Sequence, residues 1–201
     1  MILRLPHLAV IGLFVLTACA STPEPVRYAT TAHSPGARIA IPHQTIALRE
    51  VSLPAYATDE GISIADQSGA IREAPGSIWA DDPTRAVTLR LTNALADVTG
   101  RTVAADPWPF DSTPEVVVEV RMEEFVAEEA GRYVAQGRFY VAHAEDDRSD
   151  DESADSKRAD RAGSFNIIQP FDPELGFPAI ADARSRVIAA LARQIAQRGL
   201  R

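Results

Sequence analysis

Residues 115–124 read EVVVEVRMEE, and the rest of the chain is arranged around the strand that this pattern predicts. Apolar side chains recur at every second position, the period of a strand with one buried face. These positions are Val116, Val118, Val120 and Met122. Residues 131–144 alternate in the same way. Because only a short connection separates the two segments, we expect an antiparallel hairpin that turns through residues 127–130.

Shorter extended segments surround this hairpin. The segments 61–66 and 70–73 are separated by Gln-Ser-Gly and are expected to form a small hairpin of their own. Apolar runs bounded by glycine or proline predict further strands or extended chain over residues 38–41, 45–53, 102–105 and 164–171.

Two segments have helical periodicity. The first, Val87 to Thr99, follows Asp81-Asp82-Pro83, an acidic cap with proline in the first turn, and precedes Gly100, a residue type that favours helix ends. The second, Phe177 to Arg198, carries an apolar stripe formed by Ile180, Val187, Ile188, Leu191 and Ile195. We therefore expect an α/β fold, a single domain in which two helices cover a mixed, mostly antiparallel sheet.

The N-terminus has the pattern of a lipoprotein signal peptide. An apolar run from Leu8 ends in Leu16-Thr17-Ala18-Cys19, and it is far shorter than the roughly 20 residues that span a bilayer. The small residues before Cys19 suit a signal peptidase, and the thiol can be acylated before cleavage. We expect residues 1–18 to be removed and Cys19 to become the lipidated first residue.

The remaining chain divides into a tether and a folded domain. Residues 19–37 are rich in Pro, Ser and Thr, a composition that predicts a lipidated flexible tether. Residues 38–201 are expected to form the domain. Within it, residues 145–161 read EDDRSDDESADSKRADR and predict a disordered acidic loop.

Composition limits the possible partners. The formal net charge is −8 at pH 7, which does not favour binding to nucleic acid. Cys19 is the one cysteine of the chain, so no intrachain disulfide can form and stability must come from packing. Because a negative net charge gives no attraction to anionic lipid headgroups, we expect membrane contact through the acyl chains of Cys19.

No pattern typical of catalysis or cofactor binding occurs. The sequence contains neither a Gly-x-Ser-x-Gly motif nor a glycine-rich phosphate loop. The neighbouring carboxylates Glu123 and Glu124 should point to opposite faces of a strand, and the aspartates of residues 146–151 lack the spacing of a calcium loop. We expect no enzymatic activity, no metal and no cofactor.

Four aromatic residues next to prolines or turns are candidates for contact with a partner protein. These are Tyr56, Trp79, Trp108 and Phe110. An aromatic side chain in such a place either covers the end of the core or remains exposed to grip a partner, and the sequence leaves both interpretations open.

Several motifs, taken in order, carry a family resemblance. They are the pattern ending in Cys19, the phrase VSLPAY at residues 51–56, Trp79-Ala80-Asp81 before the first helix, and LARQIA at residues 191–196. Together they resemble the ABC-type transport auxiliary lipoprotein family, the PqiC-like lipoproteins of MCE transport systems. The resemblance implies a compact α/β body that serves an MCE-domain protein and its ABC permease and ATPase.

The resemblance also implies a location and two alternative functions. It implies anchoring at the periplasmic face of the outer membrane, and Ala20 agrees with this because it is not the aspartate that retains lipoproteins in the inner membrane of enteric bacteria. The first function is docking of a lipid transporter at the outer membrane, with assembly into a homo-oligomeric ring. The alternative is a periplasmic module that itself binds a lipid or another apolar ligand.

Overall fold

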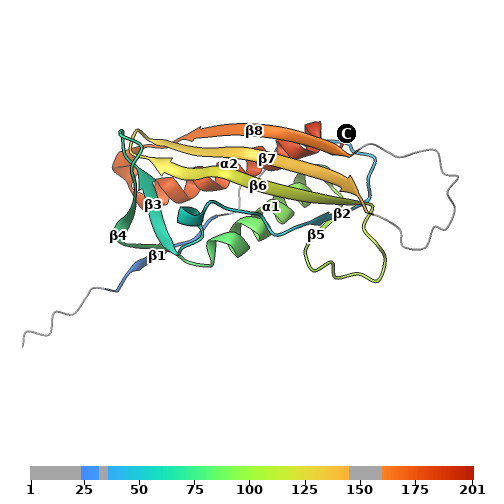
Figure 1. The fold of residues 1–201 in the computed structure, drawn as a ribbon, viewed down its shortest axis with the longest axis horizontal. Helices are drawn as coiled ribbons and strands as arrows, with labels where there is room; N and C mark the ends of the chain where they lie inside the picture. Colours follow the sequence, from blue (N-terminus) through green and yellow to red (C-terminus); the bar gives the residue numbers. More distant parts are fainter. Residues whose placement is uncertain (1–23, 32–35, 145–159) are drawn as a thin grey trace, which may run out of the picture.

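Eight strands form one open mixed sheet, and two helices pack against it (Figure 1). The computed structural model describes residues 24–31, 36–144 and 160–201, so Cys19, the predicted signal peptide and most of the acidic segment lie outside the described residues. The strands are β1 (Val26–Tyr28), β2 (Thr45–Leu48), β3 (Gly61–Ala65), β4 (Ile71–Trp79), β5 (Thr102–Ala105), β6 (Val116–Glu128), β7 (Arg132–His143) and β8 (Arg161–Pro170). The helices are α1 (Pro83–Thr99) and α2 (Phe177–Arg198), with short 3-10 turns η1 (Ala55–Ala57) and η2 (Pro173–Leu175).

Strand β6 is the centre of the sheet. One of its edges pairs with β7 along the whole strand, and β7 pairs with β8, both in antiparallel orientation. The other edge is shared by two parallel strands, β2 beside Val116–Val118 and β3 beside Ala127 and Glu128. Strand β5 extends the sheet beyond β2, whereas β4 and then β1 extend it beyond β3. The prediction of a mixed α/β sheet covered by two helices is confirmed.

A β-bulge explains why β6 is longer than the alternation in its sequence indicates. The pairing of β6 with β7 shifts register between Met122 and Glu124. After this shift Phe125 and Ala127 point to the core, where they are at most 3% exposed. The expected end of the strand at residue 124 was therefore wrong, because one extra residue reverses the faces of those that follow.

The core lies between the sheet and the two helices. Helix α1 buries Val87, Leu91, Leu95 and Val98, which recur at helical spacing, all with 0% exposure. Helix α2 buries Val187, Leu191 and Ile195 to the same extent. Both helices begin and end near the predicted residues, and Gly100 adopts the left-handed conformation (φ 66°) that terminates α1.

Three sequence-based strand boundaries need correction. Strand β2 ends at Leu48, and the chain then follows β6 irregularly, with the backbone N–H of Ser52 donating to the carbonyl of Val120. Residues 38–41 are not a strand, because the N–H of Ile39 donates to Val98 at the end of α1. Strand β4 continues to Trp79 although the pattern indicated an end at residue 73, because partners on both sides satisfy its backbone.

The structure describes residues 24–31 and 36–37 of the predicted tether, residues 19–37, and the strand β1 there corrects the expectation of flexible chain over Val26–Tyr28. Val26–Tyr28 pairs in parallel with Ser77–Trp79 of β4, and Thr30 is buried. This segment has too few apolar residues to form a core of its own. Its backbone groups instead find hydrogen-bond partners at the edge of the sheet. The folded body thus begins before residue 38.

Candidate functional site

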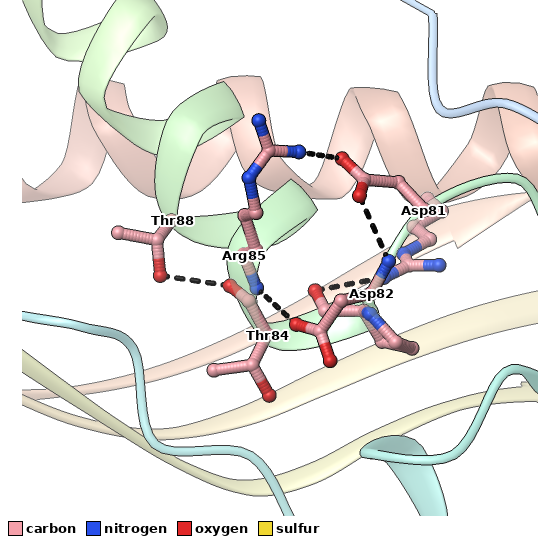
Figure 2. Close-up of polar contacts among 7 residues, drawn as sticks. Asp81, Asp82, Thr84, Arg85 and Thr88 are labelled. Carbon is pink, nitrogen blue, oxygen red and sulfur yellow. Dashed lines mark hydrogen bonds and ion pairs between the residues drawn. The ribbon is translucent and has the colours of Figure 1, made fainter.

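The N-terminus of α1 is fixed by a cluster of side-chain contacts (Figure 2). A carboxylate oxygen of Asp82 accepts from the backbone N–H of Arg85 at 2.7 Å, which caps the helix as the sequence predicted. Asp81 forms an ion pair with the guanidinium of Arg85 and accepts from the N–H of Asp82. Thr88 donates to the carbonyl of Thr84. These contacts are local and fix the first turns of α1, which begins shortly after β4 ends.

A buried arginine of α2 lies beside this helix start. The guanidinium carbon of Arg184 is 3.9 Å from the centre of the Trp79 ring and 5.3 Å from that of Phe125. Phe125 in turn meets Tyr133 edge-on at 5.2 Å between ring centres. Arg184 is 1% exposed, so these aromatic rings replace the water that would normally surround its charge.

The hydrogen-bonding capacity of Arg184 is almost unused. Among the described residues, its one hydrogen bond runs from Nη2 to the carbonyl of Pro83 at 3.5 Å. Within the described part of the chain, Nε and Nη1 have no hydrogen-bond partner and no carboxylate forms an ion pair with the guanidinium. Burial lowers the pKa of Arg184, and burial raises the pKa of Tyr133 to about 12. An unpaired buried cation is costly unless another group meets it.

Arg184 lines a cavity of about 350 Å³ between α1, α2 and the segment that follows β1. The cavity is bounded by an apolar wall that includes Tyr28, Trp79 and Leu89, and by polar groups from Thr30, Arg90 and Asn93. A second cavity of about 330 Å³ shares Thr30, Arg90 and Asn93 and continues between the helices to Ser185. Both volumes are in the range of small-ligand pockets.

Charges around the cavity favour an anion. The structure shows no ion pair for the half-buried Arg90 among the described residues. The carboxylate of Asp81 also lines the cavity, but its charge is balanced by Arg85. Two arginines that form no ion pair with a described carboxylate therefore line the same cavity from different helices.

A separate aromatic pair lies on the loop between β5 and β6. Trp108 and Phe110 meet edge-on with 4.9 Å between ring centres, and the indole N–H of Trp108 donates to the carbonyl of Ser112 at 2.6 Å. Phe110 is 51% exposed. The loop projects from the end of the molecule opposite to β1 (Figure 1). Of the four aromatic candidates, the structure brings these two together on the surface.

The other two candidates lie in the body of the domain. Trp79 is 7% exposed and contacts Arg184. Tyr56 is half-buried in η1, and its hydroxyl oxygen accepts from the backbone N–H of Phe125, just after the bulge of β6. Burial raises the pKa of Tyr56. Tyr56 thus contacts the backbone of Phe125, whereas Trp79 contacts Arg184, whose guanidinium also lies near the Phe125 ring.

Searches for metal and membrane features give negative results over the residues that the structure describes. No group of three or more His, Cys, Asp or Glu residues there could hold a metal ion. No helix there combines the length and the apolar character needed to cross a bilayer. The rings of His43 and His143 approach to 5.5 Å between centres, a pairing that the sequence did not indicate.

The fold and cavity define the class of protein as a two-layer α/β domain with a ligand-sized space between its helices. The chain belongs to the family of ABC-type transport auxiliary lipoprotein components, whose sequence profile matches residues 29–196. This confirms the family predicted from the motifs. The family consists of transport auxiliary components rather than enzymes.

Two of the matching solved structures share this fold at low sequence identity. A crystal structure of an uncharacterised protein has a TM-score of 0.67 and 15% identity, covering 87% of this chain and 98% of that one. Protein XCC0632 from Xanthomonas campestris has a TM-score of 0.60 and 15% identity, with coverage of 86% and 95%. The PelC dodecamer from Paraburkholderia phytofirmans has a TM-score of 0.36 and 14% identity, with coverage of 80% and 91%. No curated protein matches the sequence.

Sequence reasoning missed Arg90 and Arg184. A signal for Arg184 was present, because it lies four residues after Ile180 and three before Val187, on the apolar face of α2. A charged residue in an apolar stripe indicates either a buried pair or a binding group. Arg90 carried no such signal, since an arginine is ordinary on the outer face of a helix.

Proposed function

We propose that this protein is a lipid-anchored accessory subunit that docks an MCE/ABC-type lipid transport system at the periplasmic face of the outer membrane. The family match over residues 29–196 is the observation that carries this proposal. In it, acylated Cys19 holds the protein to the membrane and the domain contacts an MCE-domain protein. Ala20 after the expected acylated cysteine favours the outer membrane.

The aromatic loop supplies a contact surface for that partner. Phe110 is half exposed and is supported by Trp108, whose indole is fixed by its hydrogen bond to Ser112. Exposed aromatic side chains on a fixed support are typical anchors of protein interfaces. The loop lies at the far end of the molecule from β1, the first strand that the structure describes (Figure 1).

In-cell photocrosslinking tests this function. A photoreactive phenylalanine analogue at Phe110 is expected to capture an MCE-domain protein. The same analogue at Leu175, which is 66% exposed at the other end of the domain, serves as the control. Capture of no MCE-domain protein, or equal capture from both positions, would contradict the proposed docking. Separation of inner and outer membranes on a density gradient checks the location.

The cavity favours ligand binding as a second candidate function. It lies between two helices, has a partly apolar wall and contains a buried cation. Native mass spectrometry of the purified mature protein is expected to show a copurified ligand that dissociates on activation. A single mass equal to that of the acylated chain would argue against this function.

A further inference from the structure

We propose that the cavity beside Arg184 binds the oxyanion of an anionic amphiphile, with a phosphate as its preferred charged group. The inference develops the second candidate function and is independent of docking through Phe110. Its starting point is a guanidinium that is 1% exposed, lines the cavity and leaves Nε and Nη1 without hydrogen-bond partners among the described residues.

An oxyanion that reached Nε or Nη1 of Arg184 would supply the acceptor that the described residues do not. Hydrogen bonds between a guanidinium and a phosphate are charge-assisted and strong, and burial strengthens them further. Arg90 adds a second positive charge at the same cavity, and Asn93 and Thr30 add neutral polar groups. Because Arg85 balances Asp81, the carboxylate in the lining opposes an anion only weakly.

The remaining walls favour an apolar group attached to the anion. Tyr28, Trp79 and Leu89 line the cavity, and Leu89 is 40% exposed although it is a large apolar residue. The neighbouring cavity extends the space along α2 past Ile188 and Ala189. A ligand with a charged head near Arg184 and a short apolar portion along the helices would contact both kinds of wall. Inorganic phosphate would contact the polar wall alone.

Fluorescence of Trp79 reports binding directly. The chain has two tryptophans, so Trp108→Phe leaves Trp79 as the single reporter, in contact with Arg184. The mature chain from residue 19 with Cys19→Ser provides a protein without acyl chains. The probes are dihexanoyl phosphatidylglycerol below its micelle concentration, the zwitterionic dihexanoyl phosphatidylcholine, and inorganic phosphate.

We expect a saturable change in Trp79 fluorescence with phosphatidylglycerol, at least tenfold weaker binding of phosphatidylcholine, and weaker binding of inorganic phosphate. Equal affinity for phosphate and phosphatidylglycerol would overturn the proposal that the ligand is an amphiphile, because the site would then recognise phosphate alone. Stronger binding of phosphatidylcholine, or no saturable change with any probe, would overturn the proposal as a whole.

Variants separate this site from general attraction between charges. Arg184→Met keeps most of the apolar side chain and removes the charge, and Arg90→Gln removes the second charge from a half-buried position. Each is expected to weaken phosphatidylglycerol binding about tenfold or more, the value of one lost charge-assisted hydrogen bond. Arg138→Gln, 63% exposed on β7, changes the net charge equally and should leave binding unchanged.

The test remains decisive if Arg184→Met does not fold. Arg90 is half-buried and forms no ion pair or side-chain hydrogen bond with the described residues, so Arg90→Gln is expected to fold and carries the comparison with Arg138→Gln. Equal losses in these two variants would overturn the proposal. Failure of crosslinking at Phe110 together with saturable lipid binding would contradict docking and retain this site.

Discussion

The guanidinium of Arg184 stacks on the indole of Trp79, with 3.9 Å between the guanidinium carbon and the ring centre. This contact joins the middle of α2 to the last residue of β4, beside the start of α1. It therefore links α2 to β4 at the point where the chain enters α1. The first prediction concerns the stability that this contact contributes.

Trp79→Ala is expected to lower the free energy of unfolding by about 3–5 kcal/mol, because it removes a buried aromatic ring and leaves the charge of Arg184 without it. Trp79→Phe keeps an aromatic face toward the guanidinium and should cost clearly less. Urea unfolding followed by circular dichroism measures both. Equal losses in the two variants would show that the aromatic face itself contributes nothing.

Asp82→Ala removes the side-chain cap of α1. The backbone N–H of Arg85 then loses its acceptor, and we expect a loss of about 1 kcal/mol in the free energy of unfolding. The control is Asp97→Ala, an exposed position in the last turn of the same helix where a negative charge is not favourable. A loss in Asp97→Ala as large as that in Asp82→Ala would contradict the capping role.

Gly137→Ala tests the close approach of β7 to the bulge of β6. A Cβ at residue 137 would lie 2.1 Å from the carbonyl oxygen of Arg121 and 3.0 Å from the Cα of Met122. Because backbone atoms must move to admit it, we expect a loss of more than about 2 kcal/mol. Gly69→Ala is the comparison: it meets no atom within 4 Å, but its φ of 84° makes alanine unfavourable by about 1 kcal/mol. Thermal denaturation of both variants shows which one loses more stability, and we expect the larger loss in Gly137→Ala.

The turn between β3 and β4 gives a prediction about pH. The hydroxyl of Ser68 and then the guanidinium of Arg72 hold the pKa of Asp66 well below its usual range. A lowered pKa in the folded state means that Asp66 contributes stability above its unfolded pKa of about 4, and loses that contribution as pH falls further. The wild-type protein should therefore exceed Asp66→Asn in stability at pH 7, and this difference should shrink below about pH 4.

Urea titrations at pH 7, 4 and 3 measure the difference for Asp66. The same substitution at the exposed Asp59 serves as the control, and it should change stability little at any of these pH values. A difference between wild type and Asp66→Asn that stays constant from pH 7 to pH 3 would contradict the ionised carboxylate as the source of stability.

The parts of the fold that were predictable from sequence are those encoded locally. Asp82 and Pro83 begin α1 and Gly100 ends it, because caps depend on the residue types at the helix ends themselves. The alternation in β6 and β7 likewise predicted an antiparallel hairpin. The family followed from motifs in a fixed order along the chain.

The parts that were not predictable depend on distant contacts. The parallel pairing of β2 and β3 with the same edge of β6 joins segments whose own patterns specify no neighbour. The pairing of Val26–Tyr28 with β4 overrides a composition typical of a linker. For the candidate site, Trp79 was identified as an aromatic of interest, but its partner Arg184 lies more than 100 residues away, and only the tertiary fold brings them together.

The short parallel pairing of β1 with β4 has a mechanical consequence. A pull on the chain from residues before Val26 acts along the strand, so it loads the hydrogen bonds of three residue pairs in shear at once. Tyr28, at the end of that joint, is also part of the cavity wall. Tension on the N-terminal segment would therefore reach the boundary of the cavity before it reaches the core, and the affinity for the proposed ligand would vary with that tension.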